Sequence, residues 1–300
     1  MDVGVIGTGM MGRNHVRVYS ELKSVNSVGV FDVSTASAEE IARQHGATAY
    51  PSIGALLDAC DAVSVAVPTQ FHVDVVRQVF ESGTSVLIEK PICATSAQAT
   101  ALLAHKPAGI TVGVGHIERF NPIVEEIRKI VDKPLYVEMK RHNPASARVT
   151  GSTVVEDLMI HDIDVLISIF GRPGSIHSAG NVDLCSVLGK CGTMPVALSA
   201  SRKSSKKIRM IYIEEEEFTV EGDFMTQEIT IYRKPGQYQF EAERYVQENI
   251  IEKVMVNKLE PLKRELATFI ECVRDKKPFP VTPDQAIENL RVCETILAGL

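Results

Sequence analysis

The sequence has no tryptophan, no cysteine pair at metal-binding spacing and no apolar run that could cross a membrane. Its apolar stretches fall short of the roughly 20 residues that a transmembrane helix needs. The first of them, residues 3–6, is short and runs into glycines, so we expect no secretory signal peptide. The six cysteines are scattered without CxxC spacing, which predicts reduced thiols, no cysteine-held metal and a cytoplasmic protein.

The chain also has no excess of positive charge, since its formal net charge at pH 7 is −6. No basic run is longer than Lys206-Lys207 with its neighbours, which argues against nucleic acid and membrane surfaces as partners. Single nucleotide anions can still bind through helix N-termini and a few arginines. The length of 300 residues predicts about two domains, and 45% apolar content is enough for ordinary cores.

A glycine motif follows the first predicted strand directly and leads into a helical pattern, the context that a dinucleotide fingerprint requires. Gly7 would permit the tight turn, Gly9 would let a pyrophosphate approach the backbone, and Gly12 would let the helix pack closely on the strand. The helix N-terminus would supply free N–H groups to the phosphates. The candidate cofactor contacts in this segment are Gly7, Gly9, Met10, Met11 and Gly12.

The second predicted strand, residues 27–31, ends at Asp32. This acid lies at the spacing expected, after Gly12, for the carboxylate that binds the adenosine ribose diol. A carboxylate at this position would repel a 2′-phosphate. The sequence therefore predicts NAD rather than NADP as the cofactor.

Strands and helices alternate up to residue 114, which predicts a Rossmann-type doubly wound parallel sheet. Ligands of such sheets bind at the carboxyl ends of the strands. In one loop at these ends, we expect Thr69 to cap the next helix and to contact the cofactor. His72 would lie in the first turn of that helix. There it would either contact the cofactor or serve only in helix packing, and the sequence does not favour one of these alternatives. In another loop, Glu89 is a further candidate cofactor contact, and Lys90 opens into the crevice.

The alternation stops near residue 118, which we take as the boundary between a cofactor domain, 1–118, and a second α+β domain, 119–300. Short alternating strands between residues 175 and 232 predict an open, largely antiparallel sheet. With helices on one face only, such a sheet leaves a face to be covered. We therefore expect a homodimer or homotetramer formed through this sheet.

The second domain contains a predicted helix at residues 155–170. On a helical wheel, Asp157, His161 and Asp164 form one narrow polar stripe that we expect to line a cleft. The alternative for His161 is a core histidine satisfied by the flanking acids. Asp162 falls in the apolar arc and needs a buried partner, either a backbone N–H or an arginine. Asp157 and His161 have metal-ligand spacing but no evident third ligand, so no metal is predicted.

In combination, the glycine motif, the Glu89-Lys90-Pro91 tripeptide and the Asp157, His161 and Asp164 helix resemble the Gfo/Idh/MocA oxidoreductase family. The resemblance covers the whole chain. It implies a dehydrogenase with Lys90, Asp157 and His161 as catalytic residues. His161 would act as general base, oriented by Asp157, while Lys90 would donate to the substrate oxygen. The roles of Lys90 and His161 could also be exchanged.

Two strings, residues 115–122 and 158–164, are similar to NAD-dependent sugar-nucleotide dehydrogenases, in particular those that oxidise the 3-hydroxyl of UDP-N-acetylglucosamine. The resemblance implies a small-molecule sugar or sugar-nucleotide substrate, with Arg119, Asn121, Lys90 and His161 as its contacts. An inositol or free-sugar dehydrogenase and a non-catalytic NAD(H)-binding regulator remain alternatives. The lead into the helix, residues 151–156, departs from the glycine-rich segment of many relatives.

Overall fold

The computed structural model describes residues 1–145, 151–234, 238–241, 244–247 and 250–300. The chain divides into two compact units. The first holds residues 1–120 and 260–291, and the second holds residues 121–259 and 292–300. The sequence predicted that the chain passes from the first domain to the second only once, near residue 118, whereas residues 260–291 return to the first unit. The chain returns because helix α8 (Pro261–Asp275) places its apolar residues Leu262, Leu266 and Phe269 in the core of the first unit.

The first unit contains six parallel strands in the order β3-β2-β1-β4-β5-β6, the predicted Rossmann arrangement. The strands are β1 (Asp2–Ile6), β2 (Ser27–Phe31), β3 (Thr48–Ala49), β4 (Ala62–Val65), β5 (Ser85–Glu89) and β6 (Val112–Gly115). The central strands are buried on both faces because helices cover each side, so they read as continuous apolar runs.

The helices of the first unit form two groups. Helix α1 packs with α2 and α8, whereas α4 packs with α3 and α5. Their bounds are α1 (Met10–Glu21), α2 (Thr35–His45), α3 (Ile53–Leu57), α4 (His72–Ser82) and α5 (Ser96–Leu103). The helices that the alternating pattern predicts between the strands are thus confirmed.

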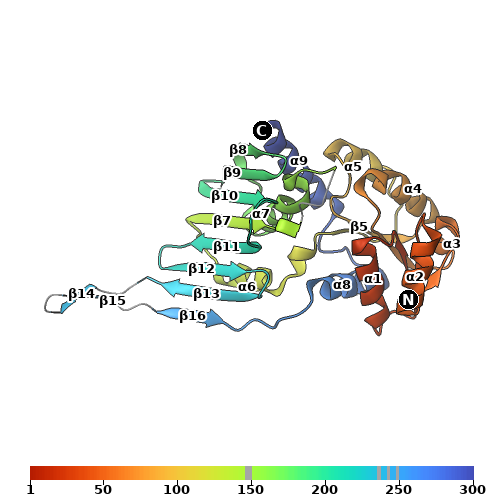
Figure 1. Ribbon diagram of the computed structural model, residues 1–300, viewed down its shortest axis with the longest axis horizontal. Helices are drawn as coiled ribbons and strands as arrows, with labels where there is room; N and C mark the ends of the chain where they lie inside the picture. The colour runs from red at the N-terminus through yellow and green to blue at the C-terminus, as the bar shows by residue number, and fades with distance from the viewer. Residues whose placement is uncertain (146–150, 235–237, 242–243, 248–249) are drawn as a thin grey trace. The chain divides into compact units, whose positions relative to one another are not determined.

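The second unit is built on an eight-stranded sheet in the order β16-β13-β12-β11-β7-β10-β9-β8 (Figure 1). Every neighbouring pair is antiparallel except β7 and β10, so the predicted largely antiparallel sheet is confirmed. The strands are β7 (Tyr136–His142), β8 (Gly174–Asn181), β9 (Leu184–Cys191), β10 (Met194–Ser201), β11 (Ile208–Glu214), β12 (Phe218–Asp223), β13 (Glu228–Arg233) and β16 (Ile251–Val254). Strands β14 (Tyr238–Glu241) and β15 (Arg244–Gln247) form a separate two-stranded antiparallel sheet.

The core of the second unit lies on one face of this sheet. It joins alternate strand residues to helix α6 (Pro122–Ile130), helix α7 (Ile160–Phe170) and the end of helix α9 (Pro283–Ala298). In β7, for example, Val137 and Met139 are buried, whereas Tyr136, Glu138 and Lys140 alternate with them and remain partly exposed. The homodimer or homotetramer that we expect to form through the opposite face of this sheet remains a prediction.

All six cysteines are free thiols. No helix in the described part of the chain is both long enough and apolar enough to span a membrane. Among the described residues, no group of three or more His, Cys, Asp and Glu side chains is arranged to hold a metal ion.

Candidate active site

The glycine turn between β1 and α1 is fixed by two glycines and left open at the third. A Cβ on Gly12 would lie 1.8 Å from the Gly7 carbonyl oxygen, and one on Gly7 would lie 2.9 Å from the Ala66 backbone. Gly7 also has a φ of +94°, which other residues rarely adopt. A Cβ on Gly9 would meet nothing within 4 Å. Gly9 is therefore where a ligand can approach the backbone.

Helix α1 begins at this turn with its N-terminus uncapped. Gly9 is the N-cap residue and has no capping side chain, and the first turn holds no acid. The Met10 side chain is exposed to solvent. The first N–H groups of α1 and its partial positive charge are therefore available to an anion such as a pyrophosphate.

Asp32 follows β2, and hydrogen bonds hold its carboxylate in place. Thr8 donates to Oδ2 from its backbone nitrogen at 2.7 Å and from its hydroxyl at 3.0 Å, and the Ser34 nitrogen donates to Oδ1 at 2.9 Å. Burial alone would raise the pKa of Asp32, but these three hydrogen bonds outweigh it and bring the pKa below its ordinary value. The open Gly9, the uncapped helix and an ionised, partly exposed acid fit a dinucleotide and its ribose diol. The sequence motif did not reveal the contribution of Thr8.

Glu89 ends β5, and its carboxylate points into the protein rather than toward solvent. His15 of α1 lies with its Nε2 2.8 Å from Glu89 Oε1, and both side chains are buried. The Lys90 backbone nitrogen donates to Glu89 Oε2 at 3.2 Å. Glu89, a candidate cofactor contact, is therefore hydrogen-bonded to His15. Lys90 itself is partly buried, and its peptide bond to Pro91 is cis.

The loop between β4 and α4 differs from its prediction at Thr69. Residues Thr69–Phe71 form a short 3₁₀ turn, and α4 starts at His72 without a side-chain cap, so the predicted Thr69 cap is wrong. Because the 3₁₀ turn leads directly into α4, the N-cap position is taken by Phe71, and the Thr69 hydroxyl lies too early in the chain to cap the helix. His72 does begin the helix, as predicted.

The His72 ring is buried between two backbone carbonyls. Nε2 lies 2.9 Å from the Val67 oxygen and Nδ1 lies 3.2 Å from the Ile92 oxygen. Burial lowers the pKa of His72 below its ordinary value, although both carbonyls oppose that shift. Of the two readings, this arrangement favours packing over cofactor contact, because the ring ties the loop after β4 to the segment that follows Lys90.

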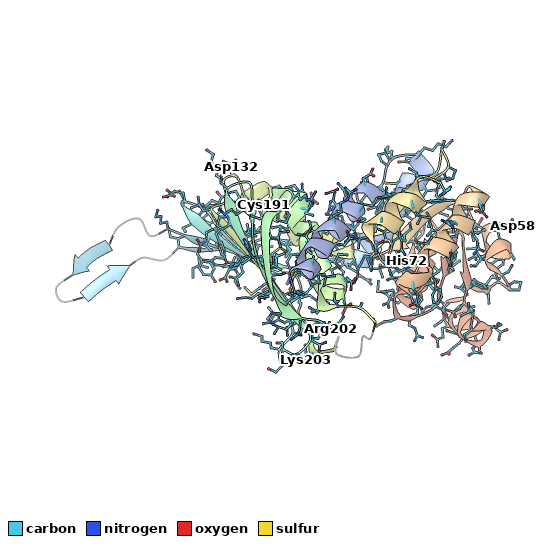
Figure 2. The ribbon with its side chains drawn as sticks, turned by 90° about the horizontal axis from the view of Figure 1, so that it is seen from above. Asp58, His72, Asp132, Cys191, Arg202 and Lys203 are labelled. Atoms are coloured by element: carbon cyan, nitrogen blue, oxygen red, sulfur yellow. The ribbon has the colours of Figure 1, made fainter. Side chains whose placement is uncertain are left out.

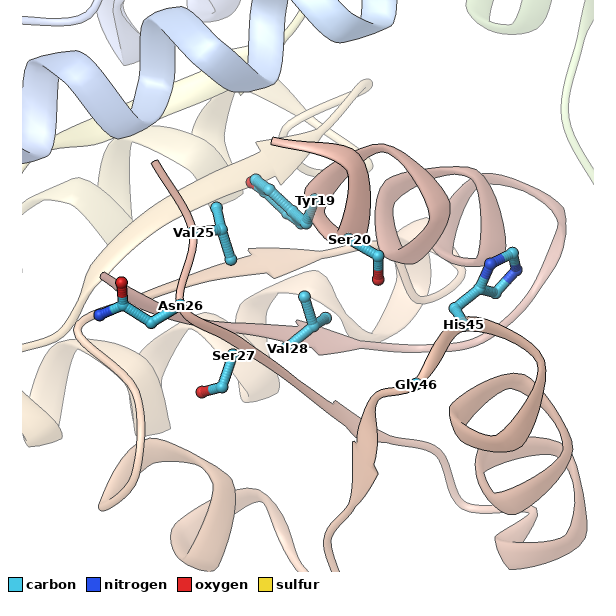
Figure 3. Close-up of a pocket in the computed structure, with 8 residues that line it drawn as sticks. All are labelled: Tyr19, Ser20, Val25, Asn26, Ser27, Val28, His45 and Gly46. Atoms are coloured by element: carbon cyan, nitrogen blue, oxygen red, sulfur yellow. The ribbon is translucent and has the colours of Figure 1, made fainter. Parts of the chain in front are cut away.

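A hollow in the first unit lies away from these residues. It is lined by the residues of Figure 3, which are Tyr19, Ser20, Val25, Asn26, Ser27, Val28, His45 and Gly46. Ser27 and Val28 begin β2, so the hollow is at the amino ends of the strands. Ligands of doubly wound sheets bind at the opposite ends, and we do not include it in the site.

In the second unit, the helix with the predicted polar stripe begins with a capping box. The Thr153 nitrogen and hydroxyl each donate to Glu156 Oε2 at 2.9 Å, and the Glu156 nitrogen donates back to the Thr153 hydroxyl. Residues Val155–Met159 then form a π-helical turn before α7. A wheel drawn at a constant angle does not hold across such a turn, and π-turns occur often at functional sites.

Asp157 lies in this π-turn and is held by an arginine that the sequence did not reveal. Arg202, which follows β10, donates from Nη2 to Asp157 Oδ2 at 3.3 Å. The same guanidinium binds the carbonyl oxygens of Ser152 and Thr153 at 2.9 and 3.1 Å. Arg202 is almost fully buried, whereas a fifth of the Asp157 side chain is exposed. Arg202 thus fixes both Asp157 and the approach to its helix.

The rest of the predicted stripe is not uniformly open. His161 is partly exposed, but Asp164 is fully buried, which corrects its expected place along a cleft. The buried partner that Asp162 needed is Arg141, whose Nε and Nη2 lie 2.8 and 2.7 Å from Asp162 Oδ1. Phe224 packs on the Arg141 guanidinium at 5.5 Å. An arginine was one of the two partners predicted.

The two candidate substrate contacts from residues 115–122 differ in their surroundings. Asn121 is buried, caps α6 through a bond from the Ile123 nitrogen, and donates to the Phe224 carbonyl at 2.9 Å. Its amide is therefore engaged in the fold of the second unit. Arg119 is the third residue of the 3₁₀ turn Ile117–Phe120 in the first unit and is partly exposed.

The chain is similar to known proteins in both its sequence and its structure. A model of an oxidoreductase family with an NAD-binding Rossmann fold, Gfo/Idh/MocA, matches residues 1–116. UDP-N-acetylglucosamine 3-dehydrogenase of Acidithiobacillus ferrooxidans is 31% identical over 244 residues, 78% of this chain and 77% of that protein. The chain belongs to the Gfo/Idh/MocA oxidoreductase family. It is an NAD-dependent oxidoreductase, and the bound nicotinamide would accept or donate a hydride.

Two further relatives show how far the likeness extends. Inositol 2-dehydrogenase of Corynebacterium glutamicum is 31% identical over 178 residues, 55% of this chain and 53% of that protein. The solved structure of the A. ferrooxidans enzyme, GnnA, superposes over 100% of this chain and 97% of its own, with a TM-score of 0.88 at 27% identity. The likeness to levoglucosan dehydrogenase in complex with NADH, at 16% identity and a TM-score of 0.84, shows the fold.

Proposed function

We propose that this protein oxidises a secondary hydroxyl of a sugar nucleotide, and that its substrate is UDP-N-acetylglucosamine, converted at the 3-hydroxyl to the ketone. The proposal is supported by the similarity to the A. ferrooxidans enzyme over most of both chains. The candidate that competes with it is an inositol or free-sugar dehydrogenase, since inositol 2-dehydrogenases match about half of the chain. The two kinds of substrate differ in charge.

The observation that favours the charged substrate is a basic turn, residues 202–207, between β10 and β11. It carries four cations and no acid. Lys203 pairs with Asp183 at 2.9 Å, whereas Lys206 and Lys207 are exposed and make no ion pair with any described residue. Arg202 and Lys203 lie side by side at the end of β10 (Figure 2). Because Arg202 binds Asp157, the basic turn begins next to a candidate catalytic residue.

A nucleoside diphosphate needs such cations, whereas inositol and free sugars are neutral. Amino and guanidinium groups bind phosphate oxygens through charge-assisted hydrogen bonds. The turn also contains Ser204 and Ser205, whose hydroxyls can add neutral donors. In a chain with a net charge of −6, this local excess of positive charge supports an anionic substrate.

In the proposed mechanism, His161 accepts the proton of the substrate hydroxyl. A positioned base of this kind contributes about 10²–10⁴-fold to the rate. Asp157 orients the imidazole, and Arg202 keeps the Asp157 carboxylate from turning away. Lys90 donates to the reacting oxygen and stabilises its alkoxide character. In the reverse direction the same groups return the proton, and exchange of roles between Lys90 and His161 stays open.

We also propose a cytoplasmic homo-oligomer. The six free thiols are compatible with a reducing compartment. The face of the large sheet opposite its core carries Tyr136, Tyr212 and Met210, which are only partly exposed within one chain. Aromatic and methionine side chains are enriched in interfaces, so this face suits a second copy.

The experiment that tests the function is a substrate panel with NAD⁺, followed by absorbance of the reduced nicotinamide. UDP-N-acetylglucosamine should give NADH, whereas N-acetylglucosamine, myo-inositol and glucose should give little. Lys90→Met and His161→Ala should each abolish the signal while NAD binding persists. Turnover of inositol in place of the nucleotide would support the competing enzyme. NAD binding without turnover of any compound in the panel would overturn the proposed substrate.

A further inference from the structure

We propose that His15 is a positioning residue for the reaction: through Glu89 it fixes the backbone from which Lys90 extends. The inference rests on the proposed role of Lys90. It concerns a buried hydrogen-bonded pair that the glycine motif does not include. His15 lies in α1 only three residues beyond Gly12, so the helix that begins at the cofactor turn also carries this contact.

The Glu89 carboxylate is confined on several sides. His15 Nε2–H donates to Oε1 at 2.8 Å, and the Lys90 backbone N–H donates to Oε2 at 3.2 Å. Gly115 pairs with Glu89 in the sheet, and a Cβ at Gly115 would lie 3.0 Å from Oε1. The His15 side chain is fully buried, and that of Glu89 is 9% exposed. These contacts together hold the Glu89 carboxylate in one position.

This geometry joins two functions of the first unit. Gly12 presses α1 against the turn that forms the phosphate cradle, so the position of α1 is set at that end. One turn beyond His15, the fully buried ring of Tyr19 packs in the core of the first unit and holds the helix there, while its hydroxyl lies 2.8 Å from that of Ser64 in β4. The helix is thus rigidly held on both sides of His15. A rigid His15 holds Glu89, and Glu89 holds the amide that starts Lys90.

A buried pair could also serve stability alone, so the substitutions must separate the two roles. His15→Leu removes the donor, whereas His15→Gln can place an amide N–H near the former Nε2 without a titrating ring. Tyr19→Phe is the matched control, because it removes a buried hydrogen bond from the same helix but none that leads to Lys90. Its kcat should stay at the parent value while its melting temperature falls.

The first readout is steady-state kinetics with NAD⁺ and the substrate that the panel identifies. We expect His15→Leu to lower kcat by about tenfold to hundredfold, since small misplacements of a catalytic group cost this much. The dissociation constant for NAD, measured by calorimetry, should change little. His15→Gln should recover most of kcat. A kcat equal to that of the parent in His15→Leu would overturn the proposal, and so would an equal loss in the Leu, Gln and Tyr19→Phe variants.

The second readout does not depend on turnover. Pyridoxal 5′-phosphate followed by borohydride labels lysines, and peptide mass spectrometry gives the rate at Lys90 relative to exposed Lys106. Loss of the His15 bond should raise the relative rate at Lys90 in His15→Leu but not in His15→Gln or Tyr19→Phe. An unchanged rate in His15→Leu would overturn the proposal. If Lys90→Met retains full activity, the proposed function of Lys90 fails, while the labelling still decides whether His15 positions it.

Discussion

Arg202 donates a hydrogen bond to Asp157 and, with the same guanidinium, binds the carbonyl oxygens of Ser152 and Thr153. This side chain, from the first residue of the basic turn, thus secures both the Asp157 carboxylate and the residues that lead into its helix. We expect Arg202→Met to lower the free energy of unfolding by about 3 kcal/mol, because it leaves these buried acceptors without their donor.

The same substitution should reduce kcat, since Asp157 would lose its fixed position. In the double variant Arg202→Met with Asp157→Asn, part of the stability should return but none of the activity. Urea denaturation and steady-state kinetics on the four proteins give the coupling. Strictly additive losses of stability would show that the Arg202–Asp157 contact carries no energy of its own.

Asp32→Ala should shift cofactor preference from NAD toward NADP. The carboxylate that repels a 2′-phosphate would be gone, together with its bonds to the ribose diol. We expect the ratio of kcat/KM for NAD to that for NADP to fall by about tenfold or more, because charged hydrogen bonds are each worth about 1.5–3 kcal/mol. Asp58→Ala, at an exposed aspartate on the same unit (Figure 2), is the control. Unchanged selectivity in Asp32→Ala would refute the ribose assignment.

His72 should make the protein less stable in mild acid. Its pKa in the folded protein lies below the ordinary value of 6.5, so only the unfolded chain takes up a proton as the pH first falls below 6.5. Uptake by the unfolded state lowers the free energy of unfolding until the pH also passes the folded pKa. Above 6.5 both states are neutral at this residue, and it gives no pH dependence.

His72→Gln removes this titration, so it should lose less stability than the parent between pH 7 and pH 5. Urea denaturation at both pH values measures the difference. Parallel losses in the two proteins would mean that His72 does not contribute.

The basic turn should act on binding of the nucleotide rather than on chemistry. Lys206→Glu and Lys207→Glu should each raise KM for the sugar nucleotide by about fivefold with little change in kcat, since an exposed ion pair is worth up to about 1 kcal/mol. The effect should shrink as salt is raised. Lys253→Glu on β16, an edge strand of the same sheet, is the matched control. If all three variants had equal KM values, the turn would have no part in substrate binding.

Features that depend on residues close together in the sequence could be predicted, whereas features that depend on contacts between distant residues could not. The glycine turn, Asp32 and the helices of the first unit depend on local spacing, and their elements were predicted to within a few residues. The membership of helix α8 in the first unit was not predicted, because most of the core residues that its apolar face joins are more than 100 residues away in the sequence. Among the short strands expected between residues 175 and 232, β9 was not recognised, because Leu184 and Leu188 lie on its exposed face and Gly189 on its inner face, which blurs the alternation. Its neighbours β8 and β10 pair with it on both sides.

The candidate site shows the same division. The helix carrying Asp157 and His161 was evident from periodicity, whereas its π-turn has no sequence signal. Arg202 lies 45 residues beyond Asp157, and His15 lies 74 residues before Glu89. Sheet registers and helix packing bring such residues together, and a single sequence does not display them. The Thr153–Glu156 capping box is the exception, because its spacing is readable once the helix start is known.

The most direct test of the proposed reaction follows the hydride itself. UDP-N-acetylglucosamine carrying deuterium at C3 is incubated with the protein and NAD⁺, and the reduced cofactor is examined by mass spectrometry. The proposed reaction predicts deuterium in the NADH, and none when the label is at C4. Unlabelled NADH from the C3-labelled substrate, or label arriving from C4, would contradict oxidation at the 3-hydroxyl.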